Sequence, residues 1–178
     1  MSVNLKKPLK KDILPVPGFS FLTFNAKVKE KSKKNDFLIF ELNDKATTAA
    51  VFTKNKFCAA PVLLAKENLK KHNPRLLVIN SGNANAGTGK NGIDDAKKIN
   101  SLLSINFNVN SNSILPFSTG VILQPLPMKR ITQAIQDNCS KQVKYNSHWI
   151  DAARAIMTTD TVPKAISQKF FLGKNEIS

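Results

Sequence analysis

The chain has 178 residues, 42% of them hydrophobic, and this length predicts one domain with a single sizeable core. It contains no run of 18 apolar residues, so no membrane-spanning helix is expected. The net charge of +15 is typical of nucleic-acid-binding proteins. However, most of the basic residues are lysines and few are arginines, whereas nucleic-acid-binding proteins usually contact their ligand through arginine guanidinium groups and stacked aromatic rings. We therefore expect neither a nucleic-acid nor a membrane partner.

The first part of the chain is rich in lysine and predicts a β-hairpin. Met1–Pro8 lacks the apolar centre of a signal peptide, which predicts a cytoplasmic protein. Phe19–Phe24 and Phe37–Leu42 are apolar enough for strands. Lys27–Asn35 lies between them, and its charge predicts an exposed turn rather than a binding face.

The next segments predict two further strands and one helical turn. Ala46–Thr53 is rich in Thr, Ala and Val, which are compatible with a strand. Ala60–Ala65 predicts another strand, and Pro61 places it at an edge or a bulge because proline lacks a backbone N–H. Glu67–Lys71 then predicts a short helical turn.

A buried strand followed by small residues is the most distinctive local pattern. Leu76–Ile79 predicts the strand, Asn80–Gly89 contains only small, turn-forming residues, and Asp94–Leu103 predicts a helix with acids in its first turn. Such a loop either connects two elements or brings backbone close to a ligand, and both interpretations stay open. It is not a phosphate loop of the familiar type, because neither Gly-Lys-Ser/Thr nor G-x-G-x-x-G occurs.

The same order of residue types occurs a second time. Ile114–Phe117 predicts a buried strand that runs into Ser118, Thr119 and Gly120. The repetition predicts a common rim on which backbone N–H groups and hydroxyls converge, and such groups stabilise an oxyanion. No pair of nucleophile and base stands out, so a nucleophile for acyl transfer would lie elsewhere.

Two apolar stripes beyond this point predict helices. Pro127 can occupy the first helical position of the first one. The stripes consist of Met128, Ile131, Ala134, Ile135 and Cys139, and of Trp149, Ala152, Ala153 and Ile156. The second helix ends at Met157–Thr161, and Ala165–Leu172 alternates as a strand does. Strands and helices together predict an α/β or α+β domain.

The cysteines and histidines do not form a metal-binding pattern. Cys58 and Cys139 lie far apart, and only His72 and His148 could assist them, so no metal site is expected. We expect both thiols to be reduced and buried or half-buried, and both histidines to be surface or packing residues.

Four segments resemble the bifunctional ornithine acetyltransferase / N-acetylglutamate synthase family of arginine biosynthesis. They are Phe52–Asn55 with Ala59–Val62, Asn80–Gly89, Ser118–Ile122 with Leu126–Met128, and Ala152–Ala153 with Ala155–Lys164. The resemblance runs in order from about Pro17 to Lys164, and four segments at suitable spacing are specific. It implies an α/β fold, a layered αββα sandwich of the ornithine acetyltransferase / aminopeptidase-esterase type.

The resemblance also implies a reaction. A precursor cleaves itself before a threonine, and this threonine, now the N-terminus of a β chain, takes the acetyl group from N-acetylornithine and passes it to glutamate. No metal or cofactor is needed, and acetyl-CoA is a second acetyl donor in members with synthase activity. Residues 1–178 would be a single α-chain-like domain that ends before the cleavage site, is inactive alone and assembles as two α and two β chains.

Three residues are carried over from the family by position. Thr119 and Gly120 match its oxyanion-hole pair, the first through the hydroxyl and the second through the backbone N–H, and Thr158 matches a substrate-contacting position. Leu123 stands where the family often has glycine, which predicts a differently shaped turn after Ile122. The alternative hypothesis is a non-catalytic remnant or binding domain that keeps the same fold.

Overall fold

The computed structural model describes residues 6–139, 145–146 and 148–177. The first five residues, which belong to the segment examined for a signal peptide, lie outside the described residues. Among the helices that are described, none is long and apolar enough to span a bilayer.

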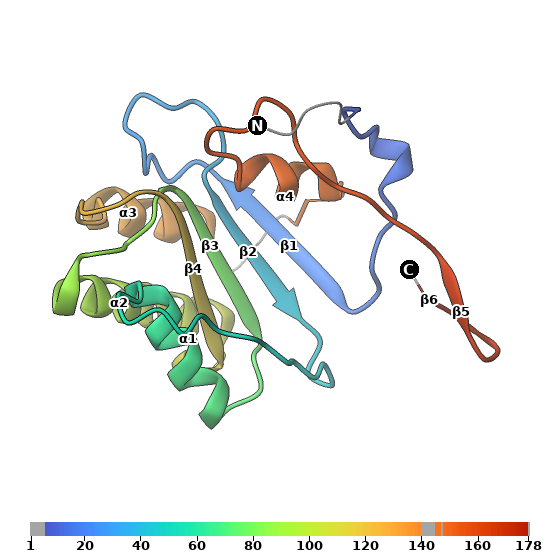
Figure 1. Cartoon of the computed structure of the whole chain (residues 1–178), viewed down its shortest axis with the longest axis horizontal. Coiled ribbons are helices and arrows are strands. Elements are labelled where there is room, and N and C mark those ends of the chain that lie inside the picture. Colours follow the sequence, from blue (N-terminus) through green and yellow to red (C-terminus); the bar gives the residue numbers. More distant parts are fainter. Residues whose placement is uncertain (1–5, 140–144, 147, 178) are drawn as a thin grey trace.

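A four-stranded sheet in the order β1-β2-β3-β4 forms the centre of the molecule (Figure 1). The strands are β1 (Phe19–Phe24), β2 (Phe37–Leu42), β3 (Leu76–Asn83), β4 (Ile114–Val121) and, in a separate hairpin, β5 (Phe170–Leu172) and β6 (Asn175–Ile177). β1, β2 and β3 pair antiparallel, whereas β3 and β4 are parallel. A parallel pair needs a crossover, and the helix between these two strands supplies it.

Helices lie on both faces of the sheet. They are α1 (Ala60–Lys71), α2 (Gly89–Phe107), α3 (Met128–Asn138) and α4 (Trp149–Ala155), with short 3-10 turns at η1 (Lys10–Asp12) and η2 (Ser111–Ser113). Figure 1 shows α4 on one side of the sheet, in the upper part of the view beside β1, and α1, α2 and α3 on the other side, at the left. The sheet is therefore the middle layer between two groups of helices.

Successive side chains of a strand point to opposite faces of the sheet, so each face has its own hydrophobic core. The core on the side of α2 and α3 includes Leu22, Phe24, Ile39, Val78, Ile99, Leu103, Ile131 and Ile135. The core on the side of α4 is smaller and consists of Phe21, Leu38, Ala152 and Ala155, with Phe40, Ile79 and Trp149 packed against it. Because both faces are covered, the strands read as nearly continuous apolar runs.

Most of the predicted elements are confirmed. The helix predicted over Asp94–Leu103 begins earlier, at Gly89, so its first turn contains no acid, contrary to the prediction. Two predicted strands are wrong. Ala46–Thr53 forms no strand, and Ala60–Ala65 begins helix α1 instead of an edge strand. Pro61 lies in the first turn of α1, where the missing N–H would have no helical partner in any case. Ala165–Leu172 is a strand only in its last three residues, which form β5.

Candidate active site at the ends of two parallel strands

The two predicted polar segments lie side by side at the carboxyl ends of β3 and β4. Ser81 pairs with Thr119, and Gly82 pairs with Gly120. The predicted juxtaposition of the two segments is therefore confirmed, while the convergence of their N–H groups and hydroxyls stays a prediction. Residues 80–83 and 118–121 belong to the strands themselves, so the loop begins later than the sequence predicts.

The side chain of Asn80 ties the two strands together just before the rim. It is 3% exposed, and its Nδ2 donates to the carbonyl of Asn83 at 2.7 Å. Its Oδ1 accepts a hydrogen bond from Ser118 Oγ at 2.6 Å. This amide uses both ends to fix the strand ends on which Thr119 and Gly120 lie.

Further asparagines hold the loop after β3. Asn83 Oδ1 accepts the backbone N–H of Asn85 at 2.8 Å, and Asn85 Nδ2 donates to the carbonyl of Gly92 at 2.8 Å. The hydroxyl of Thr88 donates to Asn85 Oδ1 at 2.7 Å. Of the two interpretations that the sequence left open for this loop, these contacts favour a structural role.

Gly120 lies where the backbones of β3 and β4 approach most closely. Its φ is +132°, and a Cβ at this position would lie 2.3 Å from the carbonyl carbon of Gly82 and 2.6 Å from the nitrogen of Asn83. The register shifts between Gly82 and Asn83, as in a β-bulge. Only glycine fits both this conformation and this separation.

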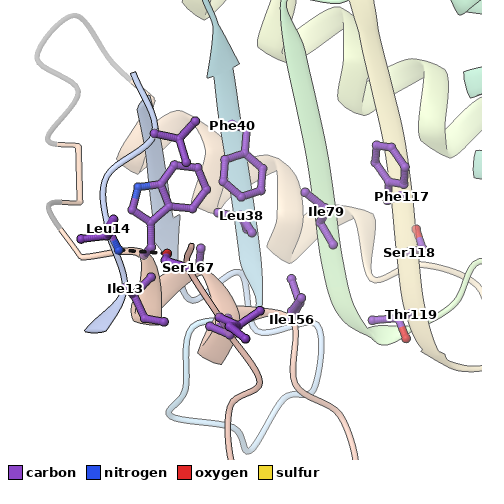
Figure 2. Close-up of a pocket in the computed structure, with 16 residues that line it drawn as sticks. Ile13, Leu14, Leu38, Phe40, Ile79, Phe117, Ser118, Thr119, Ile156 and Ser167 are labelled. Carbon is purple, nitrogen blue, oxygen red and sulfur yellow. Dashed lines mark hydrogen bonds between the residues drawn. The ribbon is translucent and has the colours of Figure 1, made fainter. Parts of the chain in front are cut away.

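Thr119 is half-buried and lines a cavity of about 610 Å³ on the α4 side of the sheet (Figure 2). The wall of this cavity is mainly apolar and includes Leu38, Phe40, Ile79, Phe117, Trp149 and Ile156. In Figure 2, Phe117, Ser118 and Thr119 follow one another along β4 at one side of the cavity. On the other side, the N–H of Leu14 donates to Ser167 Oγ at 3.0 Å. An apolar cavity with hydroxyls at one border can hold a small ligand or a docked segment of chain.

Thr158 lies in a different cavity. This second cavity, of about 350 Å³, is also lined by Gly82 and lies beyond the end of α4. Ser81 Oγ donates to the carbonyl of Ala155 at 2.7 Å and so ties the end of α4 to β3. The structure thus brings Thr119 and Gly120 together, and it places Thr158 near Gly82 rather than in the cavity that Thr119 lines.

Leu123 adopts a conformation that glycine usually provides. Its φ is +63°, and its N–H donates to the carbonyl of Ala86 at 2.8 Å. Its Cδ2 lies over Gly87, where a Cβ would be only 2.3 Å away. A left-handed backbone at a residue with a side chain costs about 1–2 kcal/mol, so the leucine is strained at this turn.

Other polar groups contribute little to this site. His72 follows the end of α1 and His148 precedes α4, and both are exposed. Within the described ranges, no group of three or more His, Cys, Asp and Glu side chains is placed to hold a metal ion. The sequence did not predict the roles of Asn80 and Ser81, although polar residues directly after a buried apolar run are a usable signal for buried hydrogen bonds.

Known proteins resemble this chain along most of its length. The "Arginine biosynthesis bifunctional protein ArgJ" of Neisseria meningitidis is 42% identical over 174 residues, which are 97% of this chain and 41% of that protein. The protein of the same name from Neisseria gonorrhoeae has the same identity and coverage. The chain therefore spans about two-fifths of the length of the curated relatives it matches.

Solved structures support the same relationship. The crystal structure of ArgJ from Bacillus halodurans has a TM-score of 0.80 at 32% identity, covering 91% of this chain and 83% of that chain. Ornithine acetyltransferase from Mycobacterium tuberculosis, complexed with ornithine, has a TM-score of 0.74 at 28% identity, covering 83% and 79%. These likenesses confirm the predicted fold class. Because residues 20–178 match the ArgJ family, the chain belongs to that family.

Proposed function

We propose that the chain is the α-chain part of a glutamate N-acetyltransferase, which moves an acetyl group from N-acetylornithine to glutamate. Thr119 and Gly120 form the oxyanion hole in this proposal, and Thr158 contacts substrate. The observation that carries it is the parallel pairing that sets Thr119 and Gly120 at the end of an edge strand, beside a cavity. Membership of the ArgJ family supports the reaction class.

The direction of the backbone at the end of β4 supports Gly120 as a donor. The N–H of Ala84 donates to the carbonyl of Val121 at 2.8 Å, so Val121 directs its backbone toward β3. Successive residues of a strand direct their backbone groups to opposite sides, and β4 lies at the edge of the sheet. We therefore expect the Gly120 N–H to point to the open side, next to the Thr119 hydroxyl.

The nucleophile in this proposal is the N-terminal threonine of a β chain, so the α-chain part is inactive alone. Exposed apolar side chains on and after β4 support a partner here: Phe117 is 44%, Val121 43% and Ile122 55% exposed. The proposal includes an assembly of two α and two β chains in the cytoplasm, no metal or cofactor, and acetyl-CoA as a further acetyl donor.

The test is Thr119→Ala in the assembly of α and β chains, assayed by acetyl transfer from N-acetylornithine to glutamate. Loss of one oxyanion donor typically lowers kcat by about 10²–10³-fold, and we expect this with little change in KM. Thr119→Ser keeps a hydroxyl and should retain much of the activity. Full activity of the alanine variant would contradict the assigned role.

Two further outcomes test the rest of the proposal. Measurable transfer by residues 1–178 alone would contradict the assignment of the nucleophile to a β chain. An assembly that binds N-acetylornithine without transferring its acetyl group would instead support the alternative, a non-catalytic binding domain of the same fold.

A further inference from the structure

One buried hydroxyl group connects the two parts of the proposed site. Thr119 and Gly120 lie at the end of β4, whereas Thr158 lies beyond the end of α4 and lines a separate cavity. Ser81 of β3 belongs to both parts: it pairs with Thr119 across the parallel strands, and it lines the cavity of Thr158. Its Oγ donates to the carbonyl of Ala155, the last residue of α4, at 2.7 Å. This bond therefore joins the rim to the segment that carries Thr158.

The sheet holds Ser81 in a fixed position. The backbone N–H of Ser81 donates to the carbonyl of Asp36 at 2.8 Å, directly before β2. Asp36 is held in turn, because its carboxylate accepts the N–H groups of Ala26 and Val28 at 2.7 and 2.8 Å. Ser81 is 4% exposed and Ala155 1% exposed, so their hydrogen bond is shielded from water. The hydroxyl thus extends toward α4 from an anchored backbone.

The position of α4 depends on contacts of this kind. The helix has seven residues, and a helix this short is marginal without tertiary contacts. Its contact with the sheet includes the small residues Ala152 and Ala155, which pack against Phe21 and Leu38. The last carbonyls of a helix lack a partner within the helix, and Ser81 supplies one for Ala155. The hydroxyl of Ser81 therefore fixes the point at which the chain leaves α4.

The short segment after α4 transmits this position to Thr158. Three residues separate Thr158 from Ala155, and three residues span at most about 10 Å. The N–H of Met157 donates to the carbonyl of Arg154 at 3.2 Å, and Asp160 accepts the backbone N–H of Thr158. These local hydrogen bonds stiffen the turn, so a shift at the end of α4 also displaces Thr158.

We propose that Ser81 is a positioning residue, which sets the separation between Thr158 and the Thr119–Gly120 pair through its bond to Ala155. The inference rests on the proposed function, in which one molecule of N-acetylornithine contacts both parts of the site. A displacement of about 1 Å in a group that orients a substrate can lower activity about 10²-fold. The hydroxyl hydrogen of Ser81 is engaged by Ala155, so Ser81 acts through Thr158 and not as a donor to the substrate.

The experiment is a double-mutant cycle, measured as KM for N-acetylornithine in the assembly of α and β chains. We expect Ser81→Ala and Thr158→Ala each to raise KM about tenfold with little change in kcat, because the bound substrate already makes this contact. In the Thr158→Ala background, Ser81→Ala should change KM less than about twofold, since the contact that Ser81 positions is already absent.

Ser101→Ala is the matched control. Ser101 Oγ on α2 also donates to a helix carbonyl, that of Lys97 at 3.0 Å, but at an exposed position. Its loss should change KM less than about twofold. Thermal unfolding verifies that each variant folds. If Ser81→Ala does not fold, Ser81→Cys replaces it in the cycle, because a thiol fills similar space and is only a weak donor.

Two kinetic outcomes would overturn the proposal. An unchanged KM in the Ser81 variant would show that its hydroxyl positions nothing that the substrate contacts. An equal rise of KM with and without the Thr158 hydroxyl would show that the effect does not pass through Thr158 and reflects a general loss of structure.

A second measurement needs no acetyl transfer. Hydrogen exchange of residues 1–178, followed by mass spectrometry, should be about threefold or more faster at residues 149–160 in Ser81→Ala than in Ser101→Ala, because loss of the bond favours local opening of α4. Equal exchange in the two variants would contradict the positioning role. The Thr119→Ala assay can fail while this measurement succeeds, so the two proposals are tested separately.

Discussion

At the scale of single residues, Gly120 combines a structural requirement with a proposed chemical role. Its positive φ and its closeness to Gly82 each exclude a side chain. The same backbone unit is the expected hydrogen-bond donor of the oxyanion hole. The resemblance of the Ser-Thr-Gly segment to the family predicts a role for Gly120. It does not reveal that β3 and β4 approach each other closely at this residue.

We expect Gly120→Ala to lower the free energy of unfolding by about 2–4 kcal/mol, because the new methyl group would meet the backbone of β3. Gly89→Ala is the matched control: Gly89 has a φ of +58°, but no atom lies within 4 Å of the added Cβ. The control should cost only about 1–2 kcal/mol, for the backbone conformation alone. Urea unfolding measures both values, and equal losses would contradict the steric argument.

The two thiols should differ in reactivity. Cys139 is fully buried and Cys58 half-buried, as the sequence predicts, and burial raises the pKa of the Cys139 thiol to about 12. Because the thiolate is the reactive form, Cys139 should stay unlabelled by iodoacetamide from about pH 7 to pH 9, below its raised pKa, and react once the chain is unfolded. Mass spectrometry of the Cys58→Ser variant isolates this thiol. Rapid labelling in the native state would contradict the expectation.

At the scale of elements, side chains from two helices form hydrogen bonds with the first residue of the edge strand β4. Asn68 Nδ2 from α1 and Asn100 Nδ2 from α2 both donate to the carbonyl of Ile114, at 2.9 and 3.0 Å. An edge strand otherwise leaves such carbonyls without a partner. The helices therefore protect the first part of β4, while its last residues stay accessible.

Asn68→Ala should lower the free energy of unfolding by about 1–3 kcal/mol, because Asn68 is 1% exposed and its bond to Ile114 would be lost in the interior. Asn91→Ala, at an exposed position of α2, should change it by less than about 0.5 kcal/mol. Thermal unfolding compares the two variants. A small effect at Asn68 would show that Asn100 alone suffices to hold the carbonyl.

The sequence predicts β1 and β2 with the observed bounds because turn-forming or polar residues flank each apolar run, Gly18 and Asn25 for β1 and Asp36 and Asn43 for β2. It fails at α1, where the short run Ala60–Ala65 does not distinguish a strand from the first turns of a helix. It also fails at Ala46–Thr53, whose β-forming residues find no partner strand, and Val51 there is 99% exposed. Strand formation depends on pairing that propensity alone does not specify.

The site could be predicted in part. Two successive patterns of strand and small polar residues predict a shared rim, and the parallel pairing of β3 and β4 confirms that the two segments lie side by side. The contacts of Asn80 and the separation of Thr119 from the cavity of Thr158 follow from the register and from the position of α4. Neither can be read from local sequence, because both depend on residues that are distant along the chain.

At the scale of the whole molecule, the sheet is covered unevenly. On one face, the residues packed against α2 and α3 are almost fully buried. On the other face, α4 packs against β1 and β2, while the apolar cavity extends over Ile79 and Phe117 on β3 and β4. If the proposed β chain exists, we expect it to pack on this less covered face of β3 and β4.

Phe117→Asp should abolish association with the β chain while changing the stability of residues 1–178 by less than about 1 kcal/mol, because Phe117 is 44% exposed. Ile105→Asp, on α2 and 80% exposed, is the matched control and should assemble normally. Co-purification of the two chains measures assembly. Normal assembly of the Phe117 variant would place the β chain on another surface.

The crossover from β3 through α2 to β4 also affects how strongly the strands that end at the rim resist local unfolding. Both strands begin in the core, since Leu76 and Ile114 are 0% exposed, and both end at the rim. Amide protons of residues 76–80, and those of Leu115 and Phe117, which the alternation along β4 directs toward β3, should thus exchange with solvent only in openings that break the core, whereas α4 and the hairpin of β5 and β6 can open locally. We therefore expect the rim to keep its conformation when α4 or the hairpin of β5 and β6 opens locally.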